Sequence, residues 1–258
     1  MVVVSKDGTQ IAYDVFGNGP ALIYISGAIC HRKFSPIVKD AKIFAQSFRT
    51  IVYDRRGRGD SSDAPLYRIE REIEDIEALI DACGGKAFLY GHSSGAVLAL
   101  ETALKTPEKV PKAVLYDIPY SASEREQAEY RLLRREVETS LANGHHTAAI
   151  RQFLVGIGMP RIFTYLLPLM PGWRRMKALA PTLLYDMTLT EPLAPIARMQ
   201  KIKVPFQLLY GAKSPDSILR VAEQVKPVVP PGNFIEVPGQ DHMVDPKILL
   251  PYLNRFLS

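Results

Sequence analysis

The sequence predicts one α/β domain built on a mostly parallel sheet, and three observations lead to this fold class. Short, almost wholly apolar runs alternate with segments whose apolar residues recur at helical spacing. Several apolar runs end in glycine-rich or polar turns, which is where open α/β sheets bind their ligands. The chain has 258 residues, a length that fits a single α/β domain with an insertion.

Strands and helices alternate through the first 120 residues, with short connections between them. The chain begins with a predicted hairpin of strands 2–5 and 10–16, joined by an Asp-Gly turn. The run 21–25 is nearly all apolar, as in strands buried on both faces of a parallel sheet. The other elements predicted here are helices over 36–47 and 67–83 and strands over 50–53, 86–90 and 112–116.

Two charged segments of this half are interpreted as structural. In the helix over 67–83 the apolar residues share one face, and the opposite face is rich in Glu and Arg, so we expect it to be solvated. The run Asp54–Ser61 reads Asp-Arg-Arg-Gly-Arg-Gly-Asp-Ser. We expect its charges to pair among themselves and to hold a loop in place.

The pattern changes over residues 121–200, where no strand is predicted. Proline-interrupted helices are expected there, over 123–142, 147–157, 161–170 and 173–189. The sheet resumes with strands at 205–211 and 234–237, and a helix over about 246–257 follows. We therefore expect a core of residues 1–120 and 201–258, with 121–200 as a helical lid inserted into it.

Composition argues against several function classes. The 32 basic and 27 acidic residues give a formal charge of +5 without a basic stripe, which disfavours nucleic-acid binding. Two cysteines, Cys30 and Cys83, make neither a disulfide framework nor a metal site. The first residues carry a charge where a signal peptide is apolar, and no apolar run is long enough to cross a bilayer. We expect a cytoplasmic protein without a membrane partner and without a metal.

The segment Gly91-His92-Ser93-Ser94-Gly95 follows a predicted strand and precedes a predicted helix. A Gly-x-Ser-x-Gly sequence in this context predicts a sharp turn that exposes the serine as a nucleophile. A chain of this length contains the five-residue pattern by chance about once in ten trials, so the pattern alone is weak. The rest of the chain must supply the groups that a serine nucleophile needs.

A serine hydroxyl becomes a nucleophile only when a base accepts its proton. His242 follows the last predicted strand, so it lies at the same edge of the sheet as Ser93 and is the predicted base. His92 adjoins the serine and should diverge from it, while His31 is expected at the mouth of a pocket. The remaining two histidines occupy a polar link and are expected to face solvent; they are His145 and His146.

Taken together, these features resemble the α/β-hydrolase superfamily over nearly the whole chain. The resemblance is carried by the turn Ser26–Ala28, the Asp54–Ser61 motif, the Gly91–Gly95 pentapeptide and the position of His242. It implies an eight-stranded sheet with helices on both faces, no cofactor, and a lid-bearing, esterase- or lipase-like serine hydrolase. In its terms Ser93 is the nucleophile, His242 the base, and the N–H groups of Ala28 and Ser94 form the oxyanion hole.

The acid of the triad departs from the common pattern. Ser214 occupies the position that is usually an aspartate, and a serine cannot supply the charge that stabilises an imidazolium. The two replacements are Asp216, close by, and Asp117, at the end of the 112–116 strand. We favour Asp117, because it leaves a strand end directly at the reacting edge. Asp241 adjoins His242 and is expected to point away from it.

The sequence therefore predicts a hydrolase of a small, largely apolar carboxylic ester, lactone, thioester or amide. The apolar stripe of residues 153–176 is interpreted as core, with one face lining the pocket. Two alternatives stay open: a lyase of the hydroxynitrile-lyase type on the same fold, and a non-catalytic member that binds a small ligand. Neither the substrate nor the oligomeric state follows from the sequence.

Overall fold

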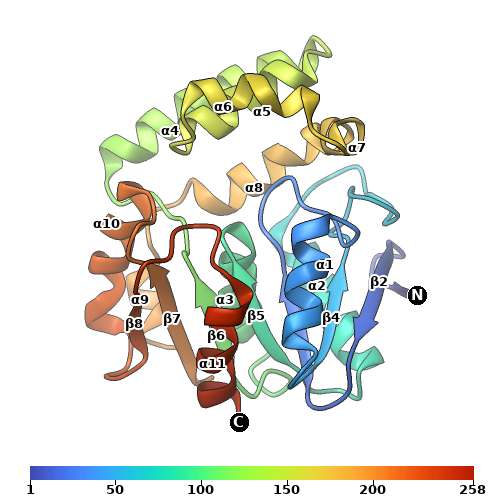
Figure 1. Cartoon of the computed structure of the whole chain (residues 1–258), viewed down its shortest axis with the longest axis vertical. Coiled ribbons are helices and arrows are strands. Elements are labelled where there is room, and N and C mark those ends of the chain that lie inside the picture. Colours follow the sequence, from blue (N-terminus) through green and yellow to red (C-terminus); the bar gives the residue numbers. More distant parts are fainter.

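A computed structural model describes residues 1–258 and shows a central sheet with helices on both faces (Figure 1). The eight strands lie in the order β1-β2-β4-β3-β5-β6-β7-β8. β2 pairs antiparallel with β1 and β4, and every pair from β4 through β8 is parallel. The predicted fold class is therefore confirmed. The strands are β1 Val2–Val4, β2 Gln10–Phe16, β3 Ala21–Ile25, β4 Arg49–Tyr53, β5 Phe88–His92, β6 Ala113–Tyr116, β7 Phe206–Gly211 and β8 Phe234–Val237.

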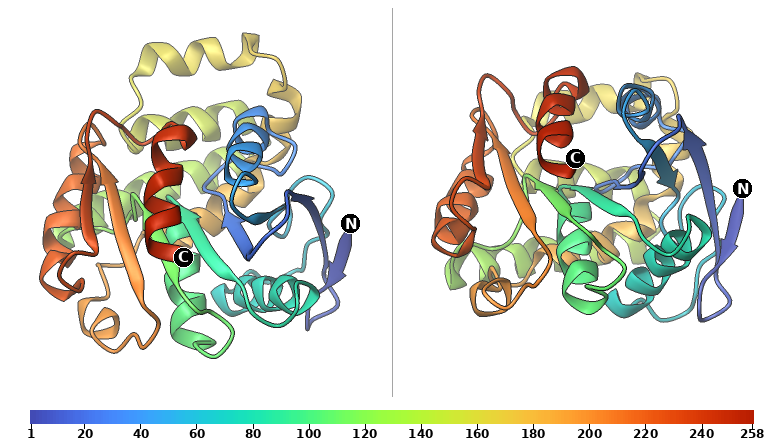
Figure 2. Two further views of the ribbon diagram at one scale, coloured as in Figure 1. Left: turned by 60° about the horizontal axis from the view of Figure 1, so that its bottom comes forward. Right: turned by 90° about the horizontal axis from the view of Figure 1, so that it is seen from below.

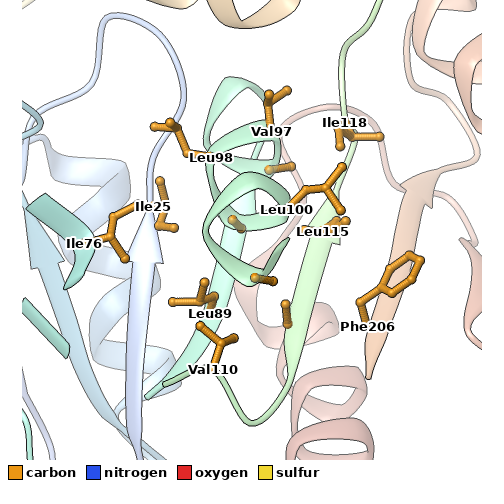
Figure 3. Packing of buried hydrophobic residues seen from close by; sticks show 14 of the residues in the cluster. Ile25, Ile76, Leu89, Val97, Leu98, Leu100, Val110, Leu115, Ile118 and Phe206 are labelled. Atoms are coloured by element: carbon orange, nitrogen blue, oxygen red, sulfur yellow. The ribbon is translucent and has the colours of Figure 1, made fainter. Parts of the chain in front are cut away.

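Each face of the sheet has its own hydrophobic core, because alternate strand residues point to opposite faces. On one face α1 (Ser35–Phe44) and α11 (Pro246–Leu257) cover a cluster of 16 buried residues. On the other, α2 (Ile69–Ala82), α3 (Ser94–Lys105) and α10 (Asp216–Val225) cover a cluster of 31. Figure 3 shows part of this larger core, with Leu100 of α3 beside Leu115 of β6.

Residues 121–190 form a helical layer above the carboxyl ends of the parallel strands, whereas the short helix that follows lies beside the sheet, where its Met199 joins the larger core (Figure 1). Nine buried residues give this layer a core of its own, to which Ile29 of the β3 turn contributes. The helix expected over 173–189 is interrupted by a 3₁₀ turn at Ala180–Thr182, because Pro181 has no N–H to donate. No helix of the chain is both long and apolar enough to span a bilayer. The helices of the layer are α4 Glu124–Ala142, α5 His146–Gly156, α6 Arg161–Leu166, α7 Trp173–Ala178 and α8 Leu183–Thr190, with 3₁₀ turns at Leu167–Leu169 and Ala180–Thr182; α9 Ile196–Met199 follows.

The first half of the charged loop after β4, Asp54–Arg58, is largely buried, and the expectation that the loop's charges pair among themselves is wrong for its arginines. Arg55 Nε donates to Glu72 Oε2 (2.7 Å), and Arg56 Nε donates to Asp75 Oδ2 (2.9 Å). Glu72 and Asp75 belong to α2 and are almost wholly inaccessible, so the acidic side of this helix is not solvated throughout. The spacing of residues within α2 could not predict the burial of these carboxylates. Their charges are compensated by arginines from another part of the chain.

Asp186 of α8 ties the helical layer to the core through two arginines of the same loop. Its carboxylate accepts hydrogen bonds from Arg55 Nη1 and from Arg58 Nη2, each at 2.6 Å, and all three side chains are buried. Burial alone would raise the pKa of Asp186, but the positive charges of Arg58 and Arg55 hold it below its ordinary value. The carboxylate is therefore charged and fully paired.

We predict that Asp186→Ala lowers the free energy of unfolding by about 3–5 kcal/mol, because it leaves two buried guanidinium groups without their shared partner. Urea denaturation followed by circular dichroism measures this change.

Asp81→Ala is the matched control, because Asp81 is half-exposed and pairs with Lys109 at the surface. We expect that change to cost less than about 1 kcal/mol. Equal effects of the two substitutions would contradict a special role for the buried pair.

Candidate active site

Ser93 lies in a tight turn between β5 and α3, with backbone angles φ 57° and ψ −129°. The two flanking glycines are required by space. A Cβ at Gly91 would lie 2.3 Å from the carbonyl oxygen of Gly95, and a Cβ at Gly95 would lie 2.1 Å from that of Ile25. Helix α3 thus starts in direct backbone contact with the end of β3, and the serine is raised at the edge of the sheet.

Three residues other than glycine have a positive φ, and all three follow adjacent strands of the sheet. They are Ile29 after β3 (55°), Ser93 after β5 (57°) and Asp117 after β6 (48°). Such conformations cost about 1–3 kcal/mol each and collect at functional sites. The strained positions therefore mark one small region at the carboxyl edge of the sheet.

The turn after β3 and the start of α3 each place one backbone donor near Ser93. Gly27 approaches the serine so closely that a Cβ there would lie 3.0 Å from the Ser93 Cβ. Ala28 follows in this turn, and Ser94 begins α3; both line the same cavity as Ser93. The N–H groups of Ala28 and Ser94 donate to no other group of the protein. They are available to an oxygen bound next to the serine.

A hydrogen bond of 2.8 Å joins His242 Nδ1 to Asp117 Oδ2. Asp117 is wholly buried and is held by two further donors, the Gly211 N–H (3.1 Å) and the Ser214 hydroxyl (2.5 Å). Ser214, which occupies the usual acid position, thus contacts the carboxylate that bonds the histidine. With its Nδ1 held by a carboxylate, His242 presents Nε2 as the free ring nitrogen.

The other two aspartates weighed from the sequence make no hydrogen bond to His242. Asp216 is exposed at the first position of α10. Asp241 Oδ1 accepts a hydrogen bond from the N–H of Met243, within its own loop (2.8 Å). Among the three candidates, the structure joins only Asp117 to the histidine.

His92 also contacts the His242 loop. Its Nε2 lies 2.7 Å from the carbonyl oxygen of His242, and the two rings are 4.8 Å apart between centroids. Burial, together with the neighbouring His242, lowers the pKa of His92 to about 4. His92 is thus neutral near pH 7 and donates from Nε2 to this carbonyl, which fixes the loop. His31 is not among the residues that line the cavity with Ser93.

A cavity of about 350 Å³ lies between the sheet edge and the helical layer, and both Ser93 and His242 line it. No hydrogen bond joins these two side chains. The apolar wall comes from α4, α5, α10 and the residue after α5, and charged residues of α4 and α10 add polar groups. These lining residues are Leu133, Phe153, Ile157 and Ile218, with Glu126, Glu129 and Arg220. No cluster of three or more His, Cys, Asp or Glu side chains is arranged to hold a metal.

Asp186 reaches this site from the helical layer, and sequence reasoning missed it. The Ser94 hydroxyl donates to Asp186 Oδ1 (2.7 Å), and Arg58, which pairs with the same carboxylate, donates to the carbonyl oxygen of Gly27 (2.7 Å). Asp186 is thus linked to both segments that carry the free N–H groups. The available signal was a single acidic residue within the otherwise uncharged run 178–190.

Comparison with solved structures shows a close relative of the whole chain. An alpha/beta hydrolase from Sphaerobacter thermophilus is 34% identical, covers 100% of both chains and superposes with a TM-score of 0.88. An enol-lactonase from Burkholderia xenovorans is 16% identical, covers 100% of this chain and 99% of its own, and superposes with a TM-score of 0.72. This second likeness shows the fold alone.

Comparison of sequences gives the family. The uncharacterized hydrolase YraK of Bacillus subtilis is 33% identical over 108 residues, which is 40% of this chain and 39% of that protein. The chain thus spans about two fifths of the length of this curated relative. Residues 23–247 match the family described as "Alpha/beta hydrolase family". This match covers most of the chain, and the protein is therefore a member of the alpha/beta hydrolase family.

Proposed function

We propose that the protein is a serine hydrolase that cleaves a carboxylic ester, lactone, thioester or amide through an acyl-enzyme on Ser93. The observation that carries this proposal is the hydrogen bond between His242 and Asp117 in a cavity that Ser93 also lines. A histidine held by a buried carboxylate beside a serine in a strained turn has the parts of a nucleophile–base–acid triad.

In the proposed reaction, the Ser93 hydroxyl gives its proton to His242 Nε2 and its oxygen attacks the substrate carbonyl carbon. Asp117 stabilises the imidazolium that forms. The tetrahedral intermediate collapses as the bond to the leaving alcohol breaks, and His242 returns the proton to that alcohol. Water then attacks the acyl group with His242 as base, which releases the carboxylic acid and restores the serine.

The free N–H groups of Ala28 and Ser94 would bind the oxygen that becomes negative in each tetrahedral intermediate. The N-terminal end of α3 adds its positive dipole at the same place. Donors that are fixed before the reaction stabilise such an oxyanion by about 3 kcal/mol each. Their fixed placement is supported by the Ser94–Asp186 and Arg58–Gly27 hydrogen bonds.

The lining of the cavity favours a substrate whose bound part is a small, largely apolar acyl or alkyl group. Leu133, Phe153 and Ile157 of the helical layer line it together with Ile218 of α10. We propose that residues 121–200 act as a lid that shields this group and the acyl-enzyme from bulk water.

We predict that a fluorophosphonate probe labels Ser93 covalently and that Ser93→Ala abolishes both the labelling and the turnover of p-nitrophenyl esters. Alanine removes the only atom that can form the acyl bond. Intact-protein mass spectrometry detects the label, and the release of p-nitrophenol measures the turnover.

The same mass measurement separates the proposed reaction from its alternatives. An acyl adduct on Ser93 in a rapidly quenched reaction is expected of the hydrolase. A lyase forms no such adduct, and a protein that only binds a ligand shows neither the adduct nor turnover. Either of those outcomes contradicts the proposal.

We predict that Asp117→Asn lowers kcat by roughly ten-thousandfold, because the amide holds the wrong tautomer of His242 and cannot stabilise its charged form. Asp216→Asn is the matched control and should leave kcat near the wild-type value, since this residue makes no hydrogen bond to His242. Steady-state kinetics on one ester give both values. Loss of activity in the control alone would reverse the assignment of the acid.

A second variant tests the same assignment by restoring function. The Ser214 hydroxyl lies 2.5 Å from the Asp117 oxygen that bonds His242, so a carboxylate placed at position 214 can reach nearly the same point. We expect Asp117→Asn/Ser214→Asp to recover part of the activity lost in Asp117→Asn. Ser214→Asp alone puts two carboxylates together in a buried space and should destabilise the protein.

We predict that the free energy of unfolding falls as the pH drops from about 6.5 to about 4, and that His92→Gln reduces this slope. The unfolded chain takes up a proton on His92 near pH 6.5. The folded chain does so only near pH 4, so the protonated form favours unfolding in this range. One proton corresponds to about 1.4 kcal/mol per pH unit. Urea titrations at several pH values measure how the free energy of unfolding changes with pH in wild type and in His92→Gln. Identical slopes in the two proteins would show that His92 is not the source of the pH dependence.

A further inference from the structure

One stretch of the helical layer carries basic residues but no acidic ones. No Asp or Glu occurs between Glu138 and Asp186, whereas the same stretch carries five Lys or Arg side chains. This equals the formal charge of +5 for the whole chain, so the rest of the sequence carries equal numbers of basic and acidic residues. The five cations are Arg151, Arg161, Arg174, Arg175 and Lys177.

The outer part of this stretch exposes large apolar side chains. The "outer surface" comprises Ile162, Phe163, Tyr165, Leu166, Leu169 and Met170, each at least half exposed and Leu169 81% exposed. Thr164 is the only buried residue of α6, a helix that rests on α5 at the periphery of the molecule (Figure 2). The interpretation of the 153–176 stripe as core is therefore wrong for this part. Exposed apolar clusters of this kind mark interaction sites.

Cations flank the outer surface without acidic partners. Arg161, Arg174, Arg175 and Lys177 are exposed, and none of them lies within 4.0 Å of a carboxylate. Arg151 stacks on the Tyr165 ring, with its guanidinium carbon 4.4 Å from the ring centroid. Apolar side chains beside unpaired cations are complementary to a surface that is apolar below and negatively charged above.

We propose that the outer surface docks the protein onto a lipid membrane with anionic headgroups. The apolar side chains would enter the boundary between headgroups and acyl chains, and the flanking cations would contact the phosphates and carboxylates of the lipids. A second copy of this chain fits less well, because a symmetric pairing through this surface would bring two cationic stretches together. No membrane partner was expected from the sequence; the proposal concerns attachment to a surface and involves no spanning helix.

Ile157 lies in the short link between α5 and α6, the helix that carries most of the outer surface. This side chain is 36% exposed and also lines the cavity. Docking through α6 would therefore hold the apolar wall of the cavity beside the lipid layer. The attachment itself is independent of the proposed hydrolysis, because none of the six residues of the outer surface lines the cavity.

The only tryptophan of the chain, Trp173, begins α7, three positions after Met170 of the outer surface and directly before Arg174, so its fluorescence can report on docking. We expect wild-type protein to sediment with vesicles of phosphatidylcholine and phosphatidylserine, with a blue shift of the tryptophan emission. Vesicles of phosphatidylcholine alone should bind much less, and added salt should weaken the binding. Ser93→Ala should bind like wild type, so failure of the proposed hydrolysis would leave this result unchanged.

Two variants test the two parts of the outer region. Arg174→Gln/Arg175→Gln/Lys177→Gln should weaken partitioning onto the anionic vesicles by on the order of a hundredfold. Phe163→Ser/Leu169→Ser should abolish the emission shift. The matched controls are Lys201→Gln/Lys203→Gln and Leu66→Ser, which change exposed residues elsewhere and should bind like wild type. All four variants should retain the wild-type melting temperature and the turnover of a soluble ester.

Three outcomes would overturn the proposal. The first is equal binding to neutral and anionic vesicles, or none to either. The second is an equal loss of binding in the test and control variants. The third is a concentration-dependent dimer in analytical ultracentrifugation that Phe163→Ser/Leu169→Ser dissociates, which would assign the outer surface to a second copy of the chain.

Discussion

The geometry of the site depends on how closely helix α3 approaches the end of β3. A Cβ at Gly95 would lie only 2.1 Å from the carbonyl oxygen of Ile25, so backbone meets backbone at this contact. The chain enters the helix from β5 through a positive φ at Ser93. The same contact sets the N-terminus of α3 beside the turn that carries Ala28, which is why two unpaired N–H groups lie next to one hydroxyl.

Two buried carboxylates belong to the site around Ser93, and they differ in whether their negative charge is compensated. Asp186 shares its charge with two guanidinium groups and the Ser94 hydroxyl, so its negative charge is fully compensated. Asp117 has only neutral donors besides His242, namely the Ser214 hydroxyl and the Gly211 N–H. Its charge is therefore available to a protonated imidazole. In the proposed reaction the first carboxylate positions backbone and the second responds to the proton.

The sequence predicted the fold well because buried strands and helical periodicity are local signals. It also placed Ser93, His242 and Asp117 at one edge of the sheet, since the carboxyl ends of parallel strands meet there. The sequence did not predict the ion pairs and hydrogen bonds between residues far apart in the chain. Glu72 and Asp75 lie on the polar side of a periodic helix, and nothing local reveals that Arg55 and Arg56 bury them. Asp186 joins residues more than 90 positions away. The exposure of α6 depends on how the helices around it pack. The periodicity of apolar residues in the sequence carries no information about that packing.

The pairing of Asp186 with Arg55 and Arg58 also divides the molecule dynamically. Helix α8 is held to the core by buried charges, whereas α6 packs on α5 and on the 3₁₀ turn that follows it, and exposes nearly all its side chains. Local opening requires little free energy where few buried contacts are lost. The amide hydrogens of α8 should therefore exchange with solvent as slowly as those of the central sheet. Those of α6 should exchange much faster. The boundary between cooperative units would then fall inside the inserted segment, and α8 would belong with the core.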